Sequence, residues 1–304
     1  MARVKRDSGY TVSVEEAVDQ YLSHCKSRNL SLVTLDTYSR HLKWLYLYID
    51  CKSIDRVTVQ DLELMMDKFL DDHQYNSTKS INNYKRYINT FFKWCKRNKL
   101  ITEDIRLDYS KQDHKLQRIP TDVEVKRLTT KPNIHHATYN DLLGWCVISI
   151  ICSTGLRIGA ITNIKKTNID FESNTIKITK SKNRKETVVI INRKLKQVLK
   201  EFMASVESES DYLFENRDGL PYKSNVMSMN IIRYCRSRNI ECSPHDLRRW
   251  FSVTYIRNGG SIFGLKNILH HSDIQTTQLY LQSCNVQTFE HELEQFNPFD
   301  NLKG

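Results

Sequence analysis

The chain has 304 residues, of which 39% are hydrophobic, and it contains 9 Gly and 5 Pro. This composition excludes collagen-like, low-complexity and disordered chains, and the length favours two domains over one. Lys and Arg number 46 against 35 Asp and Glu, a formal net charge of +11, so we expect a polyanionic partner. The charge alone also fits a basic protein that has no such partner.

The first residues, MARVKRDSGYTVS, are polar and basic and lack the apolar centre of a secretory signal. No apolar run approaches the ~18 residues that a membrane-spanning helix needs. The eight cysteines show neither a CxxC spacing nor the spacing of zinc ligands. We therefore expect a cytoplasmic protein with reduced cysteines, no membrane span and no metal site.

Residues 13–102 predict a bundle of four helices, because apolar residues recur there at the spacing of one helix face. Thr58 and Asp61 are typical of a capped start to the third helix. The predicted inward positions are Val14, Ala17, Val18, Tyr21, Leu22 and Cys25 in the first helix, Leu35, Tyr38, Leu42, Leu45 and Ile49 in the second, Leu62, Met66 and Phe69 in the third, and Ile81, Tyr84, Ile88, Phe91, Phe92 and Cys95 in the fourth.

The fourth predicted helix carries Lys79, Lys85 and Arg86 away from its apolar stripe. Such a basic surface is typical of helices that contact nucleic-acid phosphates. A basic face that is merely solvated has the same pattern. The following residues, 103–118, are polar and show no hydrophobic period, and Pro120 precedes a predicted helix cap at Thr121, so we place a domain linker at 103–118.

The segment NTIKITKSKNRKETVVIIN predicts a β-hairpin. Ile176 and Ile178 alternate with polar residues, SKNRK is a polar turn, and ETVVIIN returns as a strand. The turn is rich in lysine and includes Lys180 and Lys182. Taken alone, these lysines would be solvated or would touch a phosphate backbone.

Three further segments carry groups that suit the same chemistry. CSTGLRIGA contains Arg157, HDLRRW places His245 and Arg248 three residues apart on one helix face, and LHHSDIQTTQLY runs from His271 to Tyr280. Guanidinium and imidazole groups can hold an anion, and an activated tyrosine can act as a nucleophile. Each segment alone is commonplace, as a core tyrosine or a surface helix pair, but their combination in this order is not.

Together these segments resemble the active-site segments of the tyrosine recombinase (phage integrase) family. The resemblance is detailed over the C-terminal two-thirds of the chain and looser over the first hundred residues. Lys182 fits the position of the family's hairpin lysine, with Lys180 as the alternative. The resemblance implies six catalytic residues: Arg157, Lys182, His245, Arg248, His271 and Tyr280.

The family's chemistry divides phosphoryl transfer among these groups. The resemblance implies that Tyr280 attacks phosphorus to leave a 3′-phosphotyrosine, and that Lys182 protonates the departing 5′ oxygen. It implies that His245 assists proton transfer and that His271 hydrogen-bonds the phosphate, while the arginine pair neutralises the transition state. No metal, ATP or other cofactor is expected. The residues expected to bind DNA are Lys79, Lys85, Arg86, Lys180 and Arg249.

The resemblance also implies a mostly α fold with a small antiparallel β-sheet in the catalytic domain. The expected organisation is a basic tail over 1–12, a helical (SAM-like) core-DNA-binding domain over 13–102, a linker over 103–118, a catalytic domain over 119–285 and a C-terminal segment over 286–304 that family members often pass to a neighbouring protomer. The expected partners are double-stranded DNA with inverted-repeat core sites, further copies in a tetramer, and an accessory DNA-bending protein. The resemblance implies a bacterium, a phage or a mobile element as the source.

At three positions the sequence departs from the family pattern. Ala160 stands where an acidic residue commonly follows the first arginine, Arg249 where a second histidine often occurs, and His270 where glycine is usual. Because of these changes, a second interpretation stays open: a sequence-specific DNA-binding regulator that kept the recombinase fold and does not cut DNA. A type IB topoisomerase shares the chemistry, but the N-terminal helical domain, the TTQLY ending and the apolar terminal segment favour recombination.

Overall fold

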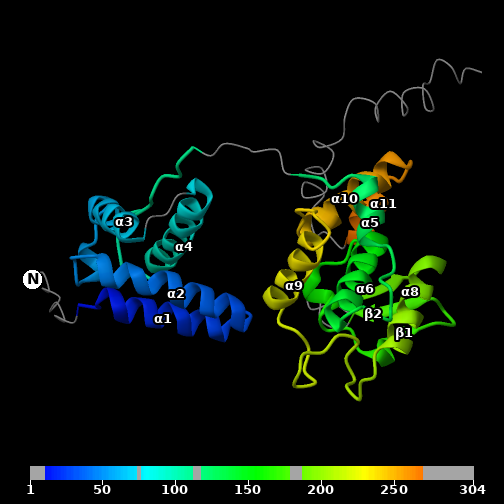
Figure 1. The fold of residues 1–304 in the computed structure, drawn as a ribbon. Helices are drawn as coiled ribbons and strands as arrows, with labels where there is room; N and C mark the ends of the chain where they lie inside the picture. Colours follow the sequence, from blue (N-terminus) through cyan, green and yellow to red (C-terminus); the bar gives the residue numbers. More distant parts are fainter. Residues whose placement is uncertain (1–10, 74–76, 112–117, 179–186, 270–304) are drawn as a thin grey trace, which may run out of the picture. The chain divides into compact units, whose positions relative to one another are not determined.

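The computed structural model describes residues 11–73, 77–111, 118–178 and 187–269. The chain divides into two compact units, residues 1–115 and 116–304, and each has its own hydrophobic core (Figure 1). Among the described residues, no helix combines the length and the apolarity that crossing a membrane requires. The architecture is mostly helical with one small antiparallel sheet, as the sequence predicts.

The first unit is a bundle of four α-helices, and the predicted apolar stripes form its core. Ser13 and Glu16 make a capping box at the start of the first helix, and Thr58 and Asp61 cap the third as expected. Within the stripes, Leu22, Leu35, Tyr38 and Ile81 are only partly buried. The elements are α1 (Val14–Ser27), α2 (Leu32–Tyr48), the 3-10 turn η1 (Ile54–Arg56), α3 (Val59–His73) and α4 (Thr78–Arg97).

The segment that follows α4 is held against that helix by two asparagines. Asn82 donates to the carbonyl of Ser110 at 2.8 Å and accepts from its N–H at 2.9 Å. Asn89, two turns further along the same face, pairs in the same way with both backbone groups of Leu107. Ile105 and Leu107 are buried in the core of the first unit. The predicted linker, 103–118, therefore begins with residues that belong to this core.

The second unit is built around α6, which is apolar on every side. Its residues Leu142–Ile151 are buried, as expected for a helix that other helices surround. A capping box at Thr121 begins the first helix of the unit, as predicted. The helices are α5 (Asp122–Leu128), α6 (Tyr139–Thr154), α7 (Ile158–Ile161), α8 (Arg193–Ser205), α9 (Ser224–Arg236), α10 (Pro244–Arg257) and α11 (Ile262–Leu269), with a 3-10 turn η2 (Lys166–Asn168).

The sheet of the second unit has the strand order β1–β2–β3 and is antiparallel. Its strands are β1 (Ile169–Asp170), β2 (Thr175–Ile178) and β3 (Thr187–Ile190). Ile176 pairs with Val189, and Ile176 and Ile178 are buried while Lys177 is exposed. The predicted hairpin and its alternation are thus confirmed. Seven of the eight cysteines lie in the described part of the chain, and all seven are free thiols.

Candidate active site

The turn between α6 and α7 determines where Arg157 lies. Gly155 ends α6 in the left-handed conformation with φ +64°, which glycine adopts without steric cost. A Cβ atom there would lie 2.6 Å from the ring of Phe251 and 2.7 Å from Leu269. The close approach of α10 and α11 to this turn therefore also requires glycine.

Arg157 is the N-cap residue of the short helix α7 and is exposed. Its side chain forms no ion pair with any residue that the structure describes. Ala160, where the family pattern commonly has an acidic residue, is partly buried and packs against the core of the second unit. The guanidinium of Arg157 thus has no neighbouring carboxylate from α7, which leaves its charge available to an anion.

Helix α10 carries His245 and Arg248 on one face, as predicted from their spacing. Ser243 and Asp246 form a capping box and Pro244 occupies the first turn. Arg248 is 3% exposed. Its guanidinium donates to the carbonyl of Gly155 and, at 3.1 Å, to the carbonyl of Leu269. Arg248 therefore joins α10 to the turn before Arg157 and to the end of α11.

The electrostatics of His245 are consistent with a position close to these arginines. Desolvation lowers the pKa of His245, and the positive charges of Arg248, Arg249 and Arg157 lower it further, against an opposing effect of Asp246. The side chain is exposed, so the ring is accessible to a bound group. A neutral imidazole beside two arginines can accept a proton and can orient a bound phosphate.

Arg249 is predicted to contact DNA, and in the structure its guanidinium binds groups of the protein itself. It is 9% exposed and its Nη1 donates to Asp246 and to the carbonyl of Arg118, both at 3.0 Å. Lys85, also predicted to contact DNA, donates to the carbonyl of Asp108 at 2.8 Å and to Ser110 Oγ at 3.2 Å. Lys79 and Arg86 on the same helix are exposed.

Four of the predicted catalytic or DNA-binding residues lie outside the described part of the chain: Lys180, Lys182, His271 and Tyr280. The departure at His270 and the C-terminal segment 286–304 lie outside it as well. What the structure brings together is the set of Arg157, His245 and Arg248. Sequence reasoning did not identify the positioning role of Gly155, although a glycine directly after a long apolar helix is a signal for a left-handed helix end.

Comparison with known proteins agrees with this arrangement. The model of the phage integrase family matches residues 120–285, and that of the phage integrase N-terminal SAM-like domain matches residues 18–99. Tyrosine recombinase XerD of Staphylococcus haemolyticus is 26% identical over 302 residues, covering 94% of this chain and 99% of the relative. A tyrosine recombinase of Thermosipho africanus is 24% identical, covering 91% and 97%.

Solved structures share the fold. The Tn1549 transposon integrase in complex with a circular intermediate DNA has a TM-score of 0.75 at 18% identity, covering 94% of this chain and 100% of that one. A lambda integrase tetramer bound to a Holliday junction has a TM-score of 0.68 at 15% identity, covering 88% and 80%. With the family's helical N-terminal unit and its arginine and histidine segments in place, the chain belongs to the phage integrase family of tyrosine recombinases.

Proposed function

We propose that the protein is a site-specific DNA recombinase that cuts and rejoins double-stranded DNA through a 3′-phosphotyrosine intermediate. The observation that carries the proposal is that the guanidinium of Arg248, one helical turn after His245 in α10, is bound to the carbonyl two residues before Arg157. Two guanidinium groups in this arrangement suit the nonbridging oxygens of a scissile phosphate. The family match over residues 120–285 supports the same chemistry.

In this proposal the oxygen of Tyr280 attacks phosphorus, and the bond from phosphorus to the 5′ oxygen breaks. The 5′ oxygen takes its proton from Lys182, with Lys180 as the alternative donor, and His245 accepts the phenol proton. His271 hydrogen-bonds the phosphate. The 5′ hydroxyl of another strand then attacks the phosphotyrosine bond, which restores the tyrosine and joins the strands. The arginine pair supplies the charge stabilisation, so the proposal includes no metal, ATP or other cofactor.

The partners in this proposal are double-stranded DNA with inverted-repeat core sites and further copies of the chain in a tetramer. The related lambda integrase has been solved as a tetramer on a Holliday junction, and the apolar spacing of Phe289, Leu293 and Phe296 suits a segment that packs on a neighbouring copy. Deletion of residues 286–304 should then abolish cooperative assembly on DNA. An accessory DNA-bending protein and a cytoplasmic location in a phage or mobile-element host complete the proposal.

The decisive experiment is an assay for a protein–DNA adduct that survives SDS. Nicked duplexes from the DNA that flanks the protein's own gene are incubated with the unmodified chain and with Tyr280→Phe. We expect an adduct with the first chain and none with the second, at nearly equal DNA affinity, because the substitution removes one hydroxyl. Tight binding without any adduct would instead favour a regulator that does not cut, and relaxation of plasmids without a specific site would favour a topoisomerase.

The identity of the general acid is tested with the same assay. Lys182→Ala should slow adduct formation, and a 5′-phosphorothiolate substrate should reduce the defect, because its leaving group needs no protonation. Lys180→Ala is the matched control, from the same hairpin turn. If the phosphorothiolate rescues Lys180→Ala and not Lys182→Ala, the roles of the two lysines are exchanged.

A further inference from the structure

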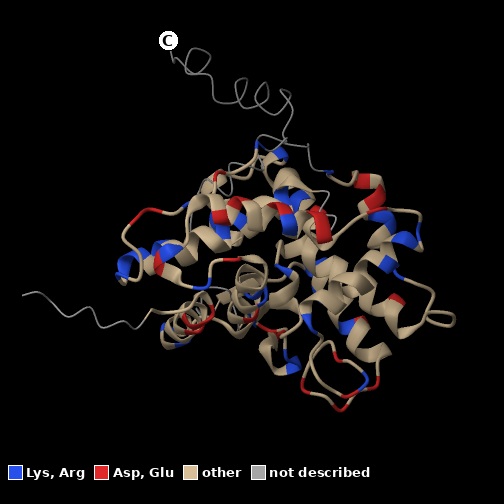
Figure 2. Ribbon diagram, turned by 90° about the vertical axis from the view of Figure 1, so that its left-hand side faces the viewer, with Lys and Arg blue, Asp and Glu red and all other residues tan. Residues whose placement is uncertain are grey.

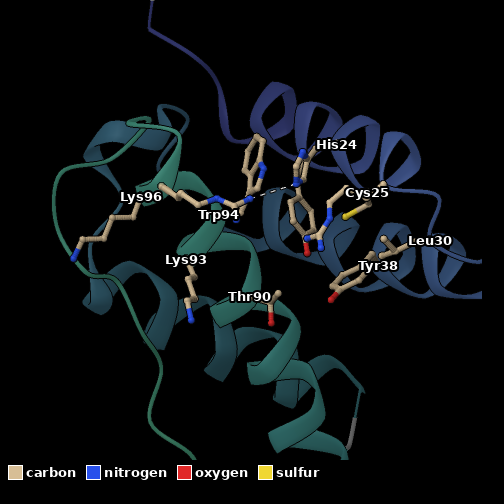
Figure 3. A pocket seen from close by; sticks show the side chains of 11 residues that line it. His24, Cys25, Leu30, Tyr38, Thr90, Lys93, Trp94 and Lys96 are labelled. Atoms are coloured by element: carbon tan, nitrogen blue, oxygen red, sulfur yellow. Dashed lines mark hydrogen bonds between the residues drawn. The ribbon is translucent and has the colours of Figure 1, made fainter. Parts of the chain in front are cut away.

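The first unit contains a pocket that the proposed chemistry does not use. The pocket has a volume of about 480 Å³ and lies among α1, α2 and α4. Figure 3 shows lining residues from two helices, among them His24 and Cys25 of α1 and Thr90, Lys93 and Trp94 of α4. Tyr21 lines it and meets both Tyr38 and Trp94 edge to face, with ring centroids 5.4 Å apart in each pair. The pocket thus offers aromatic surface to an apolar group.

Basic side chains surround this aromatic surface. Arg28, Lys93 and Arg97 line the pocket and are exposed, and no acidic residue is among its lining residues. Arg28 and Lys93 form no ion pair with any residue in the described part of the chain. An aromatic pocket with a cationic rim suits an apolar side chain that carboxylates flank.

Helix α3 presents such a side chain on its outer surface. Leu64 is 59% exposed, and Glu63, Asp67 and Asp71 are exposed beside it on the same helix face. These three carboxylates form no ion pair with another described residue, whereas the neighbouring Lys68 pairs with Asp50 at 2.7 Å. We call Leu64 with Glu63, Asp67 and Asp71 the acidic face of α3.

The two surfaces differ in charge because the helices that carry them differ in composition. Figure 2 marks Lys and Arg in blue and Asp and Glu in red along the ribbon. α4 contains six basic residues and no acidic one: Lys79, Lys85, Arg86, Lys93, Lys96 and Arg97. α3 contains five acidic residues against Lys68: Asp61, Glu63, Asp67, Asp71 and Asp72. Two complementary surfaces on one unit favour attraction between copies of that unit.

We propose that the pocket of one copy binds the acidic face of α3 of a second copy, with Leu64 entering the pocket and packing against the aromatic rings that line it. The carboxylates beside Leu64 would then meet the rim formed by Arg28, Lys93 and Arg97. Because the pocket and the acidic face are different surfaces, the contact is head-to-tail and can close into a ring in which each copy uses both. The contact goes beyond the proposed function, since it does not require that DNA be cut.

Zero-length carbodiimide cross-linking tests the contact directly, because it joins a lysine amine to a carboxylate in an ion pair. The full chain with Tyr280→Phe is used, so that failure of the cleavage chemistry has no effect on the result. Equal amounts of unlabelled and nitrogen-15-labelled chain are mixed at low ionic strength without DNA. We expect mixed-isotope peptides that join Lys93 to Glu63, Asp67 or Asp71, which only an intermolecular contact can give.

Charge reversal provides the second arm. Lys93→Glu with Arg97→Glu reverses the pocket, and Asp67→Lys with Asp71→Lys reverses the acidic face. Each reversed chain should associate at least tenfold more weakly in sedimentation equilibrium, and an equimolar mixture of the two should recover association, because one reversed pocket then meets one reversed face. Lys52→Glu with Arg56→Glu is the charge-matched control, outside both surfaces, and circular dichroism verifies folding.

The other occupants of the pocket give different outcomes, and each would overturn the proposal. Mixed-isotope links from Lys93 to carboxylates in residues 286–304 would make the C-terminal segment the occupant. Absence of any link without DNA, together with protection of Lys93 from acetylation when a random duplex is added, would make the DNA backbone the occupant. Failure of the two reversed chains to associate when mixed would exclude the charge pairing.

Discussion

Gly155 illustrates how a single residue positions the site. Its left-handed backbone ends α6 so that Arg157 follows directly, and its carbonyl accepts from Arg248. A side chain at this position would both strain the backbone and collide with Phe251 and Leu269. The residue therefore connects the helix end, the packing of α10 and α11, and the placement of both arginines.

We predict that Gly155→Ala lowers the free energy of unfolding by about 2 to 4 kcal/mol, the sum of the left-handed cost and of overpacking. Gly259→Ala is the matched control, because Gly259 also has a positive φ of 85° but a Cβ there meets nothing within 4 Å. Its loss should be about 1 kcal/mol. Urea unfolding followed by circular dichroism measures both, and equal losses would show that the collision is unimportant.

His245 reports whether Arg157 and Arg248 share its site in solution. We predict by NMR titration that its pKa lies below the ordinary value of 6.5, and that Arg157→Ala raises it, because a positive charge is removed. Arg257→Ala, at the far end of α10, should leave it unchanged. An unaltered titration in Arg157→Ala would mean that the two side chains are not neighbours.

The lowered pKa of His245 also makes the free energy of unfolding depend on pH. The pKa of His245 is lower in the folded chain than in the unfolded one, so folding favours the neutral ring. The stability that this provides is complete above the unfolded value of about 6.5 and is lost as pH falls through the lowered folded value. Activity that needs a neutral His245 should therefore persist to a lower pH than an unperturbed histidine would allow.

At the scale of elements, connecting segments are fixed to helices by polar side chains. Arg249 joins Arg118 to α10, and Trp250 Nε1 and Arg257 both donate to Asp122 at 2.7 Å. The start of the second unit is thereby bound to the helix that carries His245 and Arg248. In the first unit, Asn82 and Asn89 hold residues 107–110 on α4.

We predict that Asn82→Ala with Asn89→Ala releases this segment. Four hydrogen bonds to the backbone are lost, at about 0.5 to 1.5 kcal/mol each, so trypsin should cleave after Arg106 at least about tenfold faster than in the unmodified chain. Asn83→Ala is the control, since Asn83 is adjacent on α4 and takes no part in these bonds. Equal cleavage rates in the two variants would contradict a restraining role for the asparagines.

At the scale of the whole molecule, positive charge is present in both units. Residues 1–115 contain 20 Lys and Arg and 16 Asp and Glu, and residues 116–304 contain 26 and 19, which gives +4 and +7 and matches the total of +11. Both units can therefore contribute phosphate contacts, and DNA affinity should fall steeply with salt.

We predict that Lys79→Ala with Arg86→Ala weakens DNA binding and reduces the slope of log K against log salt by about 2, since each phosphate contact contributes about 0.9. Both side chains are exposed on α4. Lys52→Ala with Arg56→Ala removes the same charge elsewhere in the first unit and should change the slope little. A slope that changes equally in both variants would indicate a non-specific charge effect.

Much of the fold follows from local patterns. The stripes of the four N-terminal helices, the caps at Thr58 and Thr121, and the alternation around Ile176 each depend on neighbours in sequence, and the structure confirms them. The start of the linker cannot be predicted from such patterns, because Ile105 and Leu107 are isolated apolar residues in a polar segment. Leu107 is held in place by Asn89 of α4, 18 residues earlier in the chain.

The family, the helical character and the types of group available for catalysis can be predicted from the sequence, because spacing along a helix and the order of motifs are local properties of the chain. How these groups are used depends on contacts between distant segments: Arg248 is buried against the Gly155 carbonyl, Arg249 and Lys85 hold backbone segments, and Arg157 is exposed. Guanidinium and ammonium groups can donate to carbonyls as well as to phosphates, so their role depends on which acceptor the fold brings within hydrogen-bond distance.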